Sequence, residues 1–193
     1  YLYTSSTSVY PQDGGVRVDE DAATEDAPLT GQVLCESERL LADAADNFGA
    51  WYVLRLAGIY GPRRHYLLDI LRSGESVIPG VGDYFLNLIH RDDVVSAICT
   101  ALPCHSSVTS GIYNVSDDQP PSKAELAAWL AAQLGQVPPR FDPEHVSPRL
   151  KRRGGRMPSR QISNAKFRET FGWSPQYADF RAGYRDLLSA KKV

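Results

Sequence analysis

The segment Trp51-Tyr52-Val53-Leu54-Arg55-Leu56-Ala57-Gly58-Ile59-Tyr60 decides the fold class. Its residues are mostly apolar and do not alternate regularly with polar ones, which is typical of a strand buried on both faces of a parallel sheet. Before it, residues 29–48 place apolar side chains at helical spacing, and residues 1–4 have the composition of a short buried strand. A strand, a long helix and a second strand predict a βαβ crossover and therefore an α/β fold.

The chain has the composition of an ordinary globular protein. Its 193 residues can bury a sizeable core, and 42% of them are hydrophobic and 23% charged. The net charge of −2 creates no global field toward nucleic acid or anionic membranes. No apolar run approaches the roughly 20 residues that span a bilayer, no signal peptide is recognisable, and the 3 cysteines lack metal-site spacing. We therefore expect a cytoplasmic protein with free thiols and with no metal, membrane or nucleic-acid partner.

Local signals predict the remaining elements. A capping box, in which Ser122 and Glu125 satisfy free amide groups, opens one helix. Residues 11–28 are acidic with Gly and Pro, and residues 138–158 are rich in Pro and Arg, so both segments are predicted as loops. The other predicted elements are a strand over residues 111–115 and helices over residues 65–72, 92–102, 122–134, 163–172 and 178–188.

Five short segments occur in a fixed order along nearly the whole chain. They are SSTSVY (5–10), LRLAGIYGP (54–62), NLIHRDDV (87–94), GIYNV (111–115), and SNAKF with FGWSP (163–175). In this order and spacing they resemble the signature motifs of the extended short-chain dehydrogenases/reductases, the NAD-dependent epimerase/dehydratase type. Each motif is weak alone, but together they make the resemblance specific.

The resemblance implies the C-terminal part of a Rossmann-type doubly wound parallel sheet plus a small α+β substrate domain. Residues 1–62 would belong to the dinucleotide-binding domain and residues 63–193 mainly to the substrate domain, with residues 87–116 returning to the sheet. The family's Gly-rich phosphate loop belongs to earlier βαβ units, and this chain contains no G-x-x-G-x-x-G. We therefore expect a fragment that exposes an unpaired sheet edge and an apolar face, or a chain that pairs with another.

The family's catalytic pair, Y-x-x-x-K, is replaced. The register set by Gly31 and by residues 38–41 puts Thr30 at the tyrosine position and Leu34 at the lysine position. The pair works because a nearby ammonium lowers the pKa of a phenol, which then exchanges a proton with the substrate. A threonine hydroxyl is far less acidic, and a leucine carries no charge. The substitutions predict an atypical subgroup with absent or impaired tyrosine-dependent catalysis.

The resemblance also implies roles for individual residues. Ser6, Thr30 and His90 are the catalytic candidates, with Ser6 at the position that hydrogen-bonds the substrate hydroxyl. The implied cofactor-binding residues are Thr4, Ser5, Ala57, Gly58 and Ile59, around a bound NAD or NADP. The implied substrate-binding residues are Thr7, Asn87 and Arg160.

Each candidate also has a structural interpretation that the sequence leaves open. Ser6 could be a turn serine bonded to its own backbone. Thr30 could cap the long helix and Leu34 could be a core residue. His90 could be hydrogen-bonded in the turn before a helix that Asp92 or Asp93 caps, rather than act as an acid or base. Substitute bases for the missing tyrosine are Tyr10, Tyr60 and Cys35, among which spacing selects none.

Two functions remain as hypotheses. The first is an NAD(P)-dependent oxidoreductase, epimerase or dehydratase acting on a nucleotide-sugar or similar hydroxylated small molecule. The second is a non-catalytic regulatory protein that binds NAD(P) or a nucleotide-sugar. The basic residues 151–156, with Arg160, could bind the diphosphate of such a substrate, form a solvated loop or, as a third hypothesis, contact nucleic acid. By analogy with the family, the oligomer expected is a homodimer.

Overall fold

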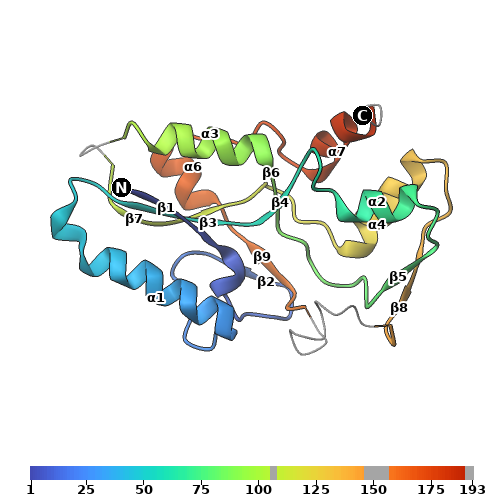
Figure 1. The fold of residues 1–193 in the computed structure, drawn as a ribbon, viewed down its shortest axis with the longest axis horizontal. Helices are drawn as coiled ribbons and strands as arrows, with labels where there is room; N and C mark the ends of the chain where they lie inside the picture. Colours follow the sequence, from blue (N-terminus) through green and yellow to red (C-terminus); the bar gives the residue numbers. More distant parts are fainter. Residues whose placement is uncertain (105–107, 146–156, 190–193) are drawn as a thin grey trace.

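A parallel sheet of three strands forms the centre of the molecule in the computed structural model, which describes residues 1–104, 108–145 and 157–189 (Figure 1). The strands are β1 (Leu2–Ser6), β3 (Tyr52–Leu56) and β7 (Gly111–Val115), in the order β1-β3-β7. All pairings are parallel, with Ser5 beside Arg55 and Arg55 beside Asn114. The outer edge of β1 has no strand partner in the described part of the chain. The α/β fold class and the free sheet edge are therefore as the sequence predicts.

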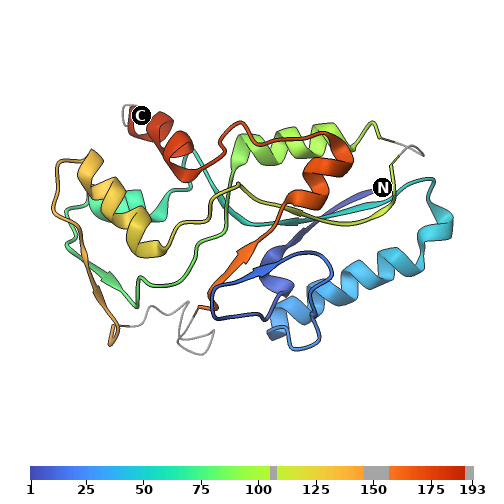
Figure 2. The same ribbon diagram turned by 180° about the vertical axis from the view of Figure 1, so that it is seen from behind.

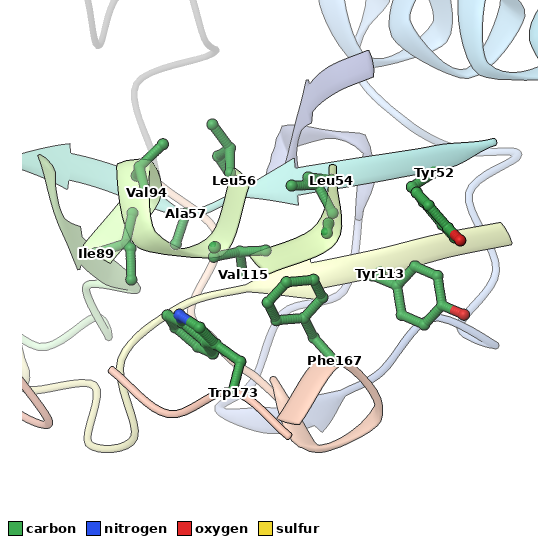
Figure 3. Close-up of a cluster of buried hydrophobic side chains, with 12 residues drawn as sticks. Tyr52, Leu54, Leu56, Ala57, Ile89, Val94, Tyr113, Val115, Phe167 and Trp173 are labelled. Carbon is green, nitrogen blue, oxygen red and sulfur yellow. The ribbon is translucent and has the colours of Figure 1, made fainter. Parts of the chain in front are cut away.

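Helices cover both faces of this sheet (Figures 1 and 2). Helix α1 (Leu29–Asp43) lies on one face, and α3 (Arg91–Ala101) and α6 (Ala165–Phe171) lie on the other. On the α3 and α6 side, aromatic rings of strands and α6 meet: Tyr113 packs edge-on against Phe167 with centroids 6.1 Å apart. Figure 3 shows this cluster, with Trp173 closing it below Val115. Such burial on both faces explains why β3 is apolar without alternation.

The strand predicted over residues 51–60 is two strands. It leaves the central sheet after Leu56 and continues as β4 (Gly58–Tyr60), which pairs in parallel with β6 (Leu88–His90). The change of partner requires close approach of two backbones: a Cβ on Gly58 would lie 2.9 Å from the Asn87 carbonyl oxygen. The glycine therefore marks the switch between sheets, which the uniform apolar composition conceals.

A second core lies at the other end of the molecule. It is built by α2 (Tyr66–Arg72), α4 (Lys123–Gln133) and α7 (Phe180–Ser189), which bury mainly leucines and aromatics. Two short strands, β5 (Val77–Pro79) and β8 (Arg140–Asp142), pair in parallel beside it. The serine half of the predicted capping box at α4 is confirmed, since the Ser122 hydroxyl oxygen accepts the Glu125 amide at 3.0 Å. The Glu125 carboxylate accepts from Arg181 at 2.6 Å.

Two segments predicted as loops contain strands. Within residues 11–28, β2 (Val16–Val18) pairs in parallel with β9 (Arg160–Ile162), and β8 lies within residues 138–158. The prediction was wrong there because each strand has 3 residues and is held by pairing with residues far away in sequence. Strand composition over so few residues gives no periodic signal.

Helix boundaries shift by a few residues from those predicted. Helix α1 ends at Asp43 and is followed by the 3-10 turn η2 (Ala45–Asn47), so the helix ends before Gly49. At the start of α6, Asn164 holds the N-cap position without a side-chain capping bond, and the Ser163 hydroxyl oxygen accepts the Ala165 amide at 3.4 Å, as expected of a capping serine. The helix ends at Phe171, and its C-cap is Gly172 in the left-handed conformation. Among the residues described, no helix is long and apolar enough to cross a membrane.

Candidate functional site

The predicted substrate-contacting serine, Ser6, is the last residue of β1 and begins the turn that follows it, here called the Ser6 turn (residues 6–9). Ser6 is half-buried and caps the 3-10 turn η1 (Thr7–Val9), and its Oγ accepts the Ser8 amide at 3.2 Å. The structure therefore agrees with the interpretation of Ser6 as a turn serine whose hydroxyl is bonded to a nearby backbone amide. Its neighbour Ser5 is buried and donates its hydroxyl to Glu38 of α1, so that side chain is already engaged.

Helix α1 begins directly against this turn. A Cβ on Gly31 would lie 2.8 Å from the Ser8 carbonyl oxygen, so only glycine allows the helix to approach so closely. This contact places Thr30 at the start of α1 beside the Ser6 turn, with its side chain exposed. Pro28, and not Thr30, is the N-cap of the helix, which corrects the capping interpretation. Leu34 is half-buried against the cluster around Val9 and Tyr10.

The implied substrate-binding residues are joined in one network. The Arg160 guanidinium donates to the Thr7 carbonyl oxygen at 3.1 Å, and the Arg160 carbonyl oxygen accepts the Asn87 side-chain amide at 3.0 Å. The side-chain carbonyl oxygen of Asn87 accepts the Ile162 backbone N–H at 2.7 Å. Asn87 and Arg160 therefore tie β6 and β9 to the Ser6 turn. The basic residues 151–156 lie outside the described residues.

His90 ends β6 and caps α3. The imidazole is buried, and its Nδ1 accepts the Asp92 amide at 3.3 Å, which leaves Nε2 as the protonated nitrogen of the neutral ring. Burial lowers the pKa of His90, against the opposing effect of the nearby Asp92 carboxylate. The helix cap is thus His90 itself rather than Asp92 or Asp93. Tyr177 packs on the ring with centroids 4.0 Å apart.

The substitute bases differ in their access. Tyr10 and Tyr60 are both buried, and burial raises the pKa of each phenol, which opposes ionisation near neutral pH. Cys35 is half-buried beside the Val9 cluster. Neither tyrosine therefore has the environment of a phenolate base. The predicted roles of Ser6, Thr30 and His90 remain predictions.

The chain is similar to curated proteins over most of its length. It is 34% identical over 182 residues to a 3-diazoavenalumate denitrifying reductase of a Streptomyces species, which covers 86% of this chain and 57% of the reductase. It is 32% identical over 140 residues to Protein YeeZ of Escherichia coli K12, covering 72% of this chain and 48% of YeeZ. The chain thus spans about half the length of these relatives. No family model matches the sequence.

Solved structures share the fold over nearly all of this chain. A protein from Methylobacillus flagellatus assigned as an NAD-dependent epimerase/dehydratase superposes with a TM-score of 0.74 at 27% identity, over 97% of this chain and 63% of that one. The dTDP-glucose 4,6-dehydratase of Bacillus anthracis, solved with NAD, superposes with a TM-score of 0.79 at 18% identity, over 97% of this chain and 59% of that one. The chain belongs to the extended short-chain dehydrogenases/reductases. Its fold corresponds to the C-terminal part of their Rossmann-type architecture.

A buried polar row crosses the sheet of this extended short-chain dehydrogenase/reductase, and sequence reasoning missed it. Ser5, Arg55 and Asn114 stand side by side on β1, β3 and β7. The Arg55 guanidinium pairs with Glu38 at 2.6 Å and donates to the Tyr10 hydroxyl at 2.8 Å. Burial alone would lower the pKa of Arg55, but its hydrogen bonds to Glu38 raise it overall. The signal that could have found the row is a lone arginine in an apolar strand, because a buried charge needs a partner.

Proposed function

We propose that the full-length protein is an NAD(P)-dependent oxidoreductase, of epimerase or dehydratase type, that works without a tyrosine–lysine pair. The observation that carries the proposal is the start of α1. Gly31 allows α1 to begin in close contact with the Ser6 turn, which supports a site at this place. In the proposal, Thr30 and Leu34 stand at the positions of that pair, so the acid–base side chains of the family have changed there.

The described residues fit the nicotinamide end of a dinucleotide. Thr4 is exposed on the free edge strand, and Gly58 is exposed without a side chain at the start of β4. Ile59 is half-buried, whereas the side chains of Ala57 and Ser5 are buried. We propose that Thr4, Gly58 and Ile59 line the cofactor, with Ala57 and Ser5 contributing through their backbone. NAD(P) would supply or accept a hydride there.

Relatives support redox chemistry and leave the substrate as a proposal. The Streptomyces relative is named as a reductase of a diazo compound, and the Bacillus anthracis neighbour acts on dTDP-glucose. We propose a nucleotide-sugar or similarly hydroxylated small molecule, contacted by Ser6 and by the turn that Arg160 and Asn87 hold. Because Thr30 cannot form a phenolate-like base near pH 7, proton transfer would limit any step that needs one.

The experiment uses the full-length protein and restores the lost pair. Thr30→Tyr with Leu34→Lys should raise turnover of UDP-glucose or dTDP-glucose about 100-fold or more and introduce a pH dependence, since general acid–base catalysis contributes that much. Leu34→Lys alone is the matched control, because it adds the charge without the phenol. Product formation is followed by chromatography of the nucleotide-sugars, because an epimerase or dehydratase returns the hydride and leaves the cofactor unchanged overall, and nicotinamide absorbance detects any net oxidation or reduction. A double variant that binds NAD(P) yet shows no gain would contradict the assignment of positions 30 and 34.

The second candidate function is binding without turnover. It is supported by the cap of α3, in which His90 Nδ1 accepts the Asp92 amide and Nε2 carries the proton, so the neutral ring offers no basic nitrogen to a substrate. Tight NAD(P) binding by the wild-type protein, with neither a new product nor net cofactor oxidation or reduction across a nucleotide-sugar panel, would favour this function. Turnover that Ser6→Ala abolishes would favour the enzyme.

We also propose a homodimer and a cytoplasmic location. Leu29, Val33 and Leu40 of α1 are 77%, 56% and 64% exposed, which leaves an apolar stripe for a partner surface. Light scattering of the full-length protein and of Val33→Glu tests the dimer. An unchanged mass for the variant would remove α1 from the interface. For location, all 3 cysteines are free thiols, which suits a reducing compartment.

A further inference from the structure

The C-terminal segment is joined to the sheet through a buried acidic junction. On one side, the amides of Gln176 and Tyr177 donate to the Asp93 carboxylate at 2.7 and 3.0 Å. On the other, the Asp118 amide donates to the Ala178 carbonyl oxygen at 3.0 Å. Beyond this junction α7 packs beside the ends of β4 and β6 (Figures 1 and 2). A few polar contacts therefore hold the entry to the last helix.

Asp117 lies inside this junction without a hydrogen-bond partner. Its side chain is buried, and neither carboxylate oxygen makes a hydrogen bond of good geometry, although the Gln119 amide lies near enough to lower its pKa slightly. The Tyr60 hydroxyl is likewise buried without a partner, and the Asp117 charge is the strongest charge acting on it. Two unsatisfied polar groups at one joint are unusual, because burial without partners costs free energy.

The surroundings of Asp117 carry mostly negative charge. Asp118 on its own loop, Asp179 on the C-terminal segment and Asp93 on α3 all act on its carboxyl group. Two nearby cations pair with other carboxylates, since Arg168 pairs with Asp118 at 2.8 Å and Arg181 pairs with Glu125 at 2.6 Å and faces Asp179 at 3.9 Å. A third, Arg17 of β2, lines a small pocket together with Asp117 and donates to the Ser163 hydroxyl at 3.1 Å. Burial first, and then Asp118, raise the pKa of Asp117 to about 8.

We propose that Asp117 is a proton-controlled latch on the C-terminal segment. When Asp117 is neutral, residues 176–189 dock on the ends of β4, β6 and β7. Its ionisation adds a negative charge between Asp93, Asp118 and Asp179, and the segment is released as the proton leaves to solvent. The release matters for the site because Tyr177 packs on His90 and Gly183 contacts Tyr60.

Hydrogen exchange of the 193-residue chain tests the latch. Opening of α7 that releases one proton should become about tenfold easier for each pH unit between pH 5 and pH 7, and should level off near pH 8. After correction for the intrinsic pH dependence of exchange, amides of residues 180–189 should show this slope and exchange faster than those of β3. Asp117→Asn should abolish the slope, and Glu36→Gln, which removes an exposed carboxylate on α1, should keep it.

Three results would overturn the latch. The first is a slope that persists in Asp117→Asn, and the second is equal exchange rates in residues 180–189 and β3, which would mean that only global unfolding exposes α7. The third needs no variant and therefore holds even if Asp117→Asn fails to fold. The Asp117 γ-carbon of the wild-type chain, followed by NMR, should titrate near pH 8, and a midpoint below pH 5 would exclude the mechanism.

Discussion

The two polar clusters buried in this molecule, one under α1 and one at the C-terminal joint, differ in how their charges are satisfied. Under α1, Glu38 and Arg55 face each other at 2.6 Å, and their remaining capacity is taken by Ser5 and Tyr10. At the joint, neither oxygen of Asp117 has a hydrogen bond of good geometry, and the charges of Asp118, Asp179 and Asp93 act on its carboxyl group. The first cluster should fix one arrangement of helix and sheet, whereas the second should tolerate only a neutral acid.

The two clusters also differ in the segments of the chain that they hold in place. The Glu38–Arg55 pair lies between α1 and β3, on the helix that carries Thr30 and Leu34. The Asp117 cluster lies where the last helix joins the sheet, on the side of His90 and Tyr177. A rigid pair therefore holds the helix that carries Thr30 and Leu34, and the proposed latch holds the segment whose Tyr177 packs on His90.

The largest expected effect comes from removing one charge of the rigid pair. Glu38→Gln keeps the shape of the side chain but leaves the Arg55 guanidinium buried without its carboxylate, which should cost about 3–5 kcal/mol in the free energy of unfolding. Urea unfolding measures it. The double variant Glu38→Gln with Arg55→Met should lose less than the sum of the two single losses, because no charge is then left alone. Additive losses would contradict the pairing.

The next effect is a pH dependence at the second cluster. The pKa of Asp117 is raised to about 8 in the fold, so folding favours the neutral acid. The stabilisation is fully present below the ordinary carboxyl range and is lost as pH rises toward 8. The free energy of unfolding should therefore fall by about 1.4 kcal/mol from pH 6 to pH 7. Half-buried Glu20 and buried Asp93 also have raised pKa values, so the measured quantity is the difference between wild type and Asp117→Asn.

A smaller effect is expected where α7 meets Tyr60. A Cβ on Gly183 would overlap the Tyr60 hydroxyl oxygen and lie 2.7 Å from the ring carbon that bears it. Gly183→Ala should cost about 1–3 kcal/mol by overpacking, although alanine would stabilise an exposed helix. Tyr60→Phe should recover part of that loss by removing the overlapping oxygen. Thermal unfolding of the single and double variants measures these costs. If Gly183→Ala were stabilising, α7 could not pack against the Tyr60 hydroxyl as closely as the structure shows.

Local signals in the sequence predicted the parts of the fold that need no distant partner. The strand over residues 111–115 and the Ser122 cap each depend only on residues that are neighbours in the sequence, and the structure has both. The pairing of β2 with β9 depends on residues 146 apart at Gly15 and Gln161, where no local pattern records it. The same limit applies to the switch of partners at Gly58, which depends on the Asn87 backbone.

The candidate site was predictable as a location more than as a set of contacts. The prediction of a helix at Thr30 and the interpretation of Ser6 as a turn serine agree with the structure, but one continuous strand was predicted through Gly58, where the structure changes from β3 to β4. The sequence did not show that the Ser5 hydroxyl is hydrogen-bonded to Glu38, or that the Asn87 side chain is hydrogen-bonded to the backbone of β9. Asp117 gave no signal, because an Asp-Asp pair after a strand has the composition of a turn, and its burial follows only from the docking of the C-terminal segment.

The smallest effect is expected at a surface counterpart of the rigid pair. Arg181 and Glu125 also meet at 2.6 Å, but their side chains are 34% and 49% exposed, against 5% and 3% for Arg55 and Glu38. Because water screens the exposed pair and solvates each charge when the other is removed, Glu125→Gln should cost less than about 1 kcal/mol. Raising the salt concentration should reduce that cost further and leave the Glu38→Gln cost nearly unchanged. Equal costs for the two isosteric changes would mean that burial does not decide the strength of these pairs, and the contrast between the clusters would then lose its physical basis.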